Sequence, residues 1–406
     1  MTSNLPKYIG NSFKRGCIQL VRRPMYFLLI VIMPLLCSWF LMDLIKGGSV
    51  QRVPVGIVDL DNSSLSRRIS RNLNGFQQVD ISRRYTNFAE ARDAVQRGEV
   101  NGFFLIPDNL EEEALGGHQP VVSYYVNYAF YAPGSMQYKG FKTISLLVNG
   151  GIVQTALRTV GLSNHRIEST LVPYQTHVHM LNNPFTNYNF YLNSTFVPCF
   201  LSLFILLVTA FSLGLELKSG LSRQWLKTSG GSMFLALVGK LVPQTVLFTA
   251  VGWFIQWMMY RCFDFPLNCN PWNMLIAMFL LVVANQSFAV LMFCFVPNFR
   301  YGTMLCTLLG MVSFSFSGFS LPQESMYPWV TSFGYVMPIK YYFLIMVDQS
   351  LNGIDLYYSR FYYAALIGFT ILPMLLSWHL KKECLNPVYV PSLKIFCSEG
   401  GNWIPS

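Results

Sequence analysis

Charged side chains are scarce in this sequence of 406 residues. Only 12% of the residues are Asp, Glu, Lys or Arg, while 52% are hydrophobic. A soluble globular protein carries about 25% charged residues. The shortage excludes an ordinary soluble fold for most of the chain and points to a lipid environment. Half of the charges that do occur lie between residues 46 and 194.

The sequence also lacks a phosphate-binding loop. The Gly239–Lys240 pair has Phe234 where the loop's first glycine would be, and Leu241 where its Ser or Thr would be. No constellation of acids, histidines or cysteines resembles a catalytic or metal site. We therefore expect no enzyme activity, no metal and no cofactor in this chain.

Ionisable residues are almost absent from the hydrophobic runs. Asp43 lies at the end of the first run and Glu216 at the end of the second. Ionisable groups inside spans mark coupled ion pathways, so their scarcity argues against a secondary transporter. Energy is expected to come from a partner. Asn285 and Gln286, in the fourth run, predict hydrogen bonds between helices rather than ligand contacts.

None of the nine cysteines lies between residues 46 and 194, which excludes a disulfide framework there. Cys262 and Cys269 share one short loop, "RCFDFPLNCN". A disulfide between them and a pair of free thiols are equally open.

Long hydrophobic runs are what the sequence has instead. Six are long enough to cross a hydrocarbon core of ~30 Å, near residues 25–45, 195–215, 236–260, 272–295, 303–321 and 361–379. The first could be a cleaved signal peptide, but it follows 24 residues and precedes "DLIKGG" rather than a small-residue cleavage site. It predicts a retained anchor.

The distribution of basic residues predicts the orientation. With the N-terminus inside, 13 Lys and Arg lie in cytoplasmic segments and three in the short outer loops. This positive-inside bias accounts for the net charge of +10 without nucleic acid. Both termini, including the tail 380–406, are therefore expected in the cytoplasm, and residues 46–194 outside it.

Two segments outside the runs have recognisable patterns. Residues 1–24 carry apolar residues at helical spacing among basic ones, which is typical of an interfacial helix. Within residues 46–194, "RVPVGIVDL", "QQVDISRRY", "NGFFLIP" and "PVVSYYVNY" predict strands. A helix capped by Ser63 or Ser64 and another capped by Asn87 lie between them. The predicted fold is thus an α-helical polytopic membrane protein with six transmembrane helices and a small α/β extracytoplasmic domain between helices 1 and 2.

Three stretches resemble the permease subunits of the ABC type-2, or type V, exporter family. "VPVGIVDLDNSSLSRRI" and "GEVNGFFLIPDNLEEEALGG" are similar to parts of the family's large extracytoplasmic domain. "SGFSLPQESMYPWVTSFGYVMPIKYYF" is similar to its outer cap, with family positions at Gly318, Pro322, Met326, Trp329 and Pro338.

The resemblance implies that residues 322–345 form short helices that re-enter the outer leaflet and close the pathway as an outer gate. Glu324 is expected to be buried there. A plain interfacial anchor is the alternative for this cap. Irregular backbone at membrane depth survives only where protein or a hydrated cavity surrounds it.

The cytoplasmic loop 216–234 departs from the family pattern, because Lys218, Leu221 and Arg223 replace an acid, a Thr and a Glu. "GKLVP", residues 239–243, does match the start of the family's third span. The resemblance implies that an ATPase contacts this loop and the interfacial helix, and the residues expected to couple to it are Glu216, Gly220, Arg223, Leu226, Lys227, Arg15 and Arg22. Glu216 is expected to pair with a basic group of that helix, and the alternative is a solvated surface acid.

The function implied by the resemblance is the membrane subunit of an ATP-driven exporter in a bacterial inner membrane. The expected partners are an ATP-binding cassette subunit that holds ATP and Mg, a second permease, a periplasmic adaptor protein and membrane lipid. The expected cargo is a hydrophobic or amphipathic molecule such as a lipid or drug. The alternative is a non-transporting membrane scaffold or receptor that serves a secretion system or a phage.

Overall fold

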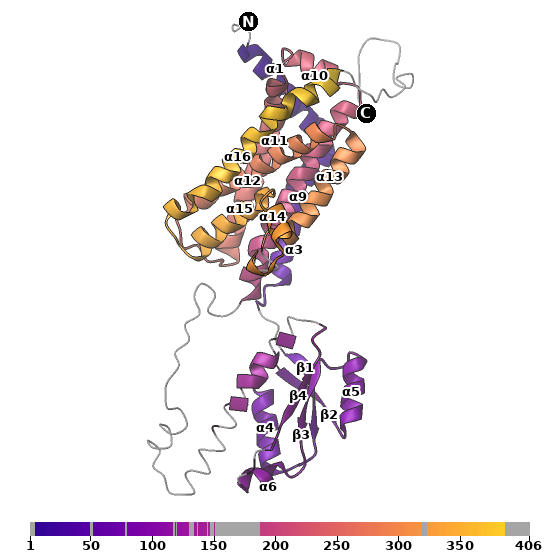
Figure 1. The fold of residues 1–406 in the computed structure, drawn as a ribbon, viewed down its shortest axis with the longest axis vertical. Coiled ribbons are helices and arrows are strands. Elements are labelled where there is room, and N and C mark those ends of the chain that lie inside the picture. Colours follow the sequence, from indigo (N-terminus) through magenta and orange to yellow (C-terminus); the bar gives the residue numbers. More distant parts are fainter. Residues whose placement is uncertain are drawn as a thin grey trace. The chain divides into compact units, whose positions relative to one another are not determined.

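The structure is a computed structural model of the chain. It describes residues 5–48, 52–77, 79–116, 118, 120–129, 134–135, 137–143, 145–146, 150, 187–318 and 323–385. These residues divide into two compact units, a helical one from residues 5–48 and 187–385 and a smaller one from residues 52–150 (Figure 1).

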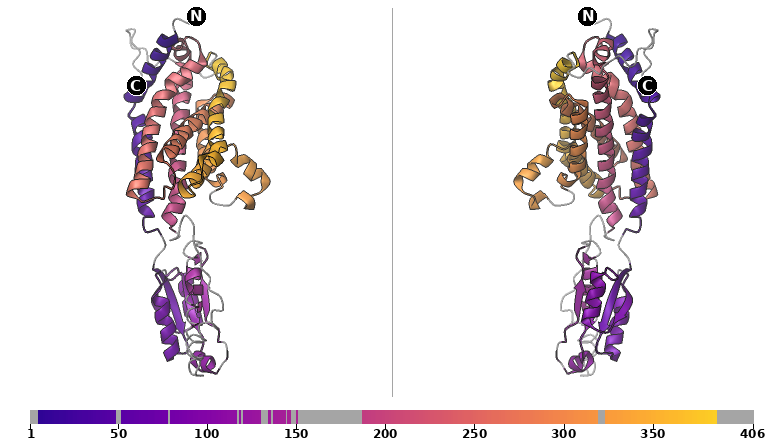
Figure 2. Two further views of the ribbon diagram at one scale, coloured as in Figure 1. Left: turned by 90° about the vertical axis from the view of Figure 1, so that its left-hand side faces the viewer. Right: turned by 90° about the vertical axis from the view of Figure 1, so that its right-hand side faces the viewer.

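The helical unit contains the long apolar helices. Its α-helices are α1 (Leu5–Arg22), α2 (Pro24–Phe27), α3 (Met33–Leu44), α9 (Tyr188–Lys218), α10 (Ser222–Thr228), α11 (Met233–Cys262), α12 (Pro271–Phe295), α13 (Phe299–Phe316), α14 (Pro328–Gly334), α15 (Pro338–Ile345) and α16 (Leu356–Leu385). Helix α12 packs against α9, α11, α13 and α16, so it forms the centre of the bundle (Figures 1 and 2).

Five helical segments are long and apolar enough to cross a membrane. They are Pro24–Leu44, Tyr188–Lys218, Met233–Cys262, Pro271–Phe295 and Leu356–Leu385. Helix α13 coincides with most of the expected span 303–321 but is not among the five, and the bent pair Pro328–Gly334 and Pro338–Leu351 makes six if it counts as one span. A multi-pass membrane protein is therefore confirmed, while the identity of the sixth span stays a prediction.

The first span begins where α1 ends. Arg23 is extended, with φ −117° and ψ 108°, and Pro24 is the first residue of α2. A residue before proline avoids the helical region, which explains the break. Helix α2 then continues through a π-helical turn, Leu28–Ile32, into α3.

The chain leaves and re-enters the helical unit at one point. The Tyr188 amide donates a hydrogen bond to the Gly48 carbonyl at 2.5 Å. Gly48 has φ +67°, and a Cβ there would lie 2.6 Å from Oδ1 of Asn187. A glycine is therefore required where α3 and α9 approach each other outside the bundle.

The smaller unit is an α/β domain, as the sequence predicted. Its four strands, in sheet order β2, β1, β3, β4, span Val79–Tyr85, Val53–Asp59, Gly102–Ile106 and Ser123–Val126. Strand β1 pairs in parallel with β2 and β3, and β4 is antiparallel to β3. Its helices are α4 (Ser64–Asn74), α5 (Phe88–Gln96) and α6 (Leu110–Leu115).

The two predicted helix caps of this domain are confirmed. The Ser63 hydroxyl accepts from the Ser66 amide at 3.1 Å, and the Asn87 side chain accepts from the Glu90 amide at 2.8 Å. The Glu90 carboxylate in turn accepts from the amide of Thr86 at 3.0 Å, one residue before the cap. This reciprocal pair satisfies amide groups that a helix start leaves without partners.

Candidate functional site

A buried charge cluster lies at the end of the bundle that holds α1 and α10. The Glu216 carboxylate, only 3% exposed, is at the last turn of α9. Its Oε2 accepts from Nη2 of Arg15, on α1, at 2.9 Å. Its Oε1 accepts from Nζ of Lys240, on α11, at 2.7 Å, and from Nε2 of Gln19 at 2.6 Å. One carboxylate therefore joins three helices.

Gln19 and Lys240 close the cluster. Lys240 is 4% exposed, and its Nζ also donates to Oε1 of Gln19 at 3.1 Å. The same ammonium lies 5.3 Å from the ring centre of Trp225, on α10. Because buried charges are costly unless they are paired and hydrogen-bonded, the four polar side chains stabilise one another only as a set.

Small residues bring α1 close enough for these contacts. A Cβ on Gly239 would lie 2.2 Å from the Cβ of Ser12, and one on Gly16 would lie 2.7 Å from the Gly239 carbonyl oxygen. The hydroxyl groups of Ser12 and Ser229 are hydrogen-bonded at 2.7 Å. Helix α1 is thus seated on α11 and on the end of α10, and no larger side chain fits at the two glycines.

The loop between α9 and α11 is attached to the end of α16. Gly220 turns the chain with φ +68°. The Ser222 hydroxyl donates to the Cys384 carbonyl at 3.0 Å, and Nε of Arg223 donates to the Leu385 carbonyl at 2.8 Å. Leu226 is buried in the bundle core. The loop therefore contacts both α1 and α16, which are the first and last helices of the helical unit.

The structure brings together only some of the residues expected to couple. Arg15 and Glu216 form an ion pair, which is the expected pairing with a basic group of the interfacial helix. Lys227 and Arg22 are exposed, and neither forms an ion pair with a described residue. The coupling role of the whole set stays a prediction.

Sequence reasoning missed Lys240 and Gln19. The sequence places Lys240 in a rejected phosphate-binding loop and in the family's "GKLVP" match, and neither identifies it as the ion-pair partner of Glu216. Arg15 and Gln19 are four residues apart on one face of a helix, and a charged and an amide side chain at that spacing beside a span was the available signal.

The cap follows α13, and its short helix α14 projects from the side of the bundle, whereas α15 packs against α12 and α16 (Figure 2). Gly318 has φ +89°, and α14 and the following helix bend by 86°. Pro338 is buried at the first turn of α15, while Trp329 is 70% exposed and Met326 is half-buried. Short helices interrupted by prolines are therefore present, and gating stays a prediction.

Glu324 is exposed, so the expectation that it is buried is wrong. It lies in a 3-10 turn, Gln323–Ser325, whose charged side chain reaches out of the protein surface. Pro322 lies outside the described residues.

Lys340, expected in a short outer loop, is buried in the bundle. It is 1% exposed, and its Nζ lies 3.3 Å from the ring centre of Tyr335. Among the described residues no hydrogen-bond partner reaches this ammonium. The aromatic face is thus its main described electrostatic contact.

Cys262 and Cys269 are both free thiols in the structure, Cys262 exposed and Cys269 half-buried. Their pairing stays a prediction for an oxidising compartment.

The expected hydrogen bonds between helices are confirmed in the bundle core. Asn285 donates to the Ser202 hydroxyl at 3.1 Å, and Gln286 accepts from the Thr245 hydroxyl at 2.6 Å.

Comparison with known proteins gives a family match over most of the chain. The model of the ABC-2 family transporter proteins matches residues 25–379, from the first span to α16. No curated protein matches this chain. The match covers both units described above, and its implication is a permease of an ABC exporter. The chain is a member of the ABC-2 family transporter proteins.

Proposed function

We propose that the chain is the membrane subunit of an ATP-driven exporter in a bacterial inner membrane, with both termini in the cytoplasm and the α/β domain in the periplasm. Two such permeases, identical or paralogous, assemble with two separate ATP-binding cassette subunits that hold ATP and Mg. The permease itself has no ATPase site. The cargo is a hydrophobic or amphipathic molecule, taken from the cytoplasm or the inner leaflet.

The observation that carries this proposal is the contact of Glu216 with both α1 and α11. A partner that pushes on α1 or on the α10 loop moves Arg15, and the ion pair transmits that displacement to α9 and α11. The contacts of Ser222 and Arg223 extend the same connection to α16. Closure of an ATPase dimer against this end of the bundle would thereby tilt α9, α11 and α16 together.

The periplasmic domain binds an adaptor protein or the matching domain of the second permease. The cap after α13 closes the pathway on the outer side. Both assignments rest on the family pattern, and the bent helix pair supports the second.

The test begins with mild-detergent purification of the tagged protein from its native membranes and mass spectrometry of its companions. Recovery of a protein with a phosphate-binding loop, and loss of ATPase activity when that loop's lysine is replaced, supports the proposal. Repeated purification without an ATPase contradicts it and favours the non-transporting scaffold or receptor.

The role of Glu216 is tested in the same complex. Glu216→Ala is expected to lower ATPase activity while the subunits stay assembled. The matched control is Asp43→Ala. It removes an exposed carboxylate from the end of the first span that lies away from α1. Unchanged activity in the Glu216 variant would remove it from the coupling pathway.

A further inference from the structure

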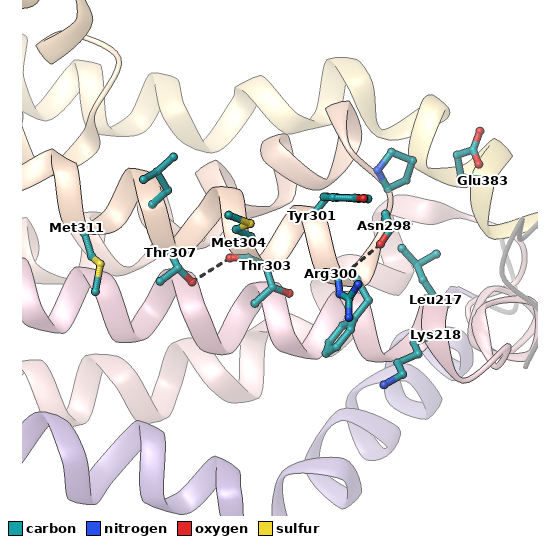
Figure 3. Close-up of a pocket in the computed structure, with 13 residues that line it drawn as sticks. Leu217, Lys218, Asn298, Arg300, Tyr301, Thr303, Met304, Thr307, Met311 and Glu383 are labelled. Carbon is teal, nitrogen blue, oxygen red and sulfur yellow. Dashed lines mark hydrogen bonds between the residues drawn. The ribbon is translucent and has the colours of Figure 1, made fainter.

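A groove of about 1040 Å³ follows one side of α13 (Figure 3). Its walls come from α13 itself, from the end of α9 and from the end of α16. It begins at the same end of the bundle as the charge cluster, because Leu217 and Lys218 directly follow Glu216. It is a separate feature, since no residue of the cluster lines it.

The groove is charged at one end and mostly apolar along the rest, where Thr303 and Thr307 are the polar exceptions. The Thr307 hydroxyl donates to the Thr303 carbonyl at 2.9 Å. Lys218 and Arg300 lie at the charged end, and Figure 3 shows the Arg300 side chain extended toward α9, where Lys218 lies. Met304, Leu308 and Met311 continue along α13 at spacings of four and three residues, so they share one face of the helix. All three are more than half exposed.

The two cations have no carboxylate partner among the residues that the structure describes. Lys218 lies 5.1 Å from the ring centre of Phe299, and Asn298 caps the start of α13 by accepting from the Arg300 amide at 3.0 Å. The Arg300 guanidinium is therefore not used by the cap. Glu383 also lines the groove, but it lies on α16, away from both cations (Figure 3).

Basic residues at the inner end of a span are ordinary, because they favour the cytoplasmic side and contact lipid headgroups at large. These two differ because both border a single groove, and most of the side chains that follow in it are apolar. A ligand that satisfies the whole groove must carry a negative head and an apolar tail, in that order.

We propose that this groove binds an anionic amphiphile, with a phosphate or carboxylate head between Lys218 and Arg300 and its tail along Met304, Leu308 and Met311. Arg300 offers a planar guanidinium that can bind two oxygens of such a head at once. The inference rests on the proposed export function in one respect only, that the bound molecule is cargo. Binding itself needs no ATPase.

The binding test uses the full chain with any co-purifying subunits, in detergent, by native mass spectrometry. Dioleoyl phosphatidic acid and dioleoyl phosphatidylcholine serve as probes because their tails are identical. We expect retention of phosphatidic acid about tenfold above phosphatidylcholine, the factor expected for two partly exposed ion pairs. The double variant K218Q/R300Q should remove this preference.

Two controls make the result specific. K381Q/K382Q removes the same number of charges from the nearby end of α16, outside the groove, and should keep the preference. Glu383→Gln removes the acid of the groove and should not weaken phosphatidic acid binding. Equal retention of the two lipids, or equal loss in K381Q/K382Q, overturns the inference.

A second measurement separates this inference from the proposed function. The purified complex, in liposomes, is given ATP and a fluorescent phosphatidic acid, and movement between leaflets is followed. Selective binding with ATP-dependent movement supports both proposals. Selective binding without movement keeps the groove as an anionic-lipid site and overturns its role for cargo, whereas ATPase activity without selective binding overturns the groove and leaves export intact.

Discussion

Arg15 and Glu216 are 201 residues apart in the sequence and meet at 2.9 Å. Arg15 is 19% exposed and Glu216 is 3% exposed, so the contact lies at the boundary between the bundle and its surroundings. Arg15 on α1 and Lys240 on α11 hold the same carboxylate. A movement of α1 that displaces Glu216 therefore also changes its contact with α11.

Glu216 should matter more for stability than either of its basic partners. Replacing it by Ala leaves two cations beside each other without a counter-charge, and such a loss costs about 3–5 kcal/mol when the group is buried. Lys240→Met leaves Glu216 with Arg15 and Gln19, so its cost should be smaller. Thermal unfolding in detergent, followed by size-exclusion chromatography, measures both. A larger loss in Lys240→Met would contradict the assigned pairing.

Gly239→Ala should displace α1 from α11. The added methyl group would overlap the Cβ of Ser12, and both partners are helix positions with little freedom to move. Gly10→Ala, on α1, is the matched control because nothing lies within 4 Å of its Cβ. Cross-linking of a Ser12→Cys and Ser229→Cys pair reports the contact, whose hydroxyl groups are 2.7 Å apart. Equal cross-linking in both alanine variants would show that α1 adapts.

Lys340→Met should keep or raise the thermal stability of the protein. A buried ammonium without a counter-charge is unfavourable, and methionine fills a similar volume without a charge. Lys340→Gln, which keeps a polar head in the same place, is the comparison. A clear loss of stability in Lys340→Met would reveal an acidic or carbonyl partner outside the described residues or in another subunit.

Whether Cys262 and Cys269 form a disulfide can be tested without a substitution. Cys262 is exposed and Cys269 is half-buried, so a maleimide reagent should label Cys262 readily in intact protein. If the two are bonded in the native membrane, labelling before reduction should be low and labelling after reduction high. Equal labelling in both samples would establish free thiols.

Acid should weaken the start of α5 in the α/β domain. Hydrogen bonds from the backbone and side chain of Thr86 lower the pKa of the Glu90 carboxyl. A lowered pKa in the folded state means that the contribution is present above the unfolded value and is lost as the pH falls through the folded one. Hydrogen exchange of α5 should therefore differ between the native protein and Glu90→Gln at neutral pH. The difference should shrink as the pH falls through the lowered pKa of Glu90 and vanish once the carboxyl is protonated in the folded state.

The α/β domain could be predicted from local signals alone. Ser63 and Asn87 are strong caps, and the runs around Val55 and Phe104 are apolar enough to be buried strands. The four strands and the helices α4 and α5 were therefore specified by their own residues, whereas α6 was not predicted. The order of the sheet was not predictable in this way, because β1 pairs with two strands that come from different parts of the domain.

The site was predictable only in part, for a physical reason. Glu216 stood out because an acid at the end of a span is rare, and its need for a basic partner follows from the cost of burial. The identity of the partners depends on how α1 crosses α11, which the close contact of Gly16 with Gly239 determines. The spacing of Arg15 and Gln19 within α1 shows that they share a face, but it does not show which helix that face meets. The exposure of Glu324 could not be predicted either, because it depends on the direction in which the short turn Gln323–Ser325 faces.

The hydrogen bond from Tyr188 to Gly48 gives the protein a modular construction. Because both ends of the segment between them meet at one point of the bundle, the cost of closing that segment depends only weakly on its length. Domains of different size can be exchanged at this point in evolution, or in the laboratory, while the register of the helices is kept. A variant in which a short Gly/Ser bridge replaces residues 49–186 would keep the helical unit as an independent folding unit.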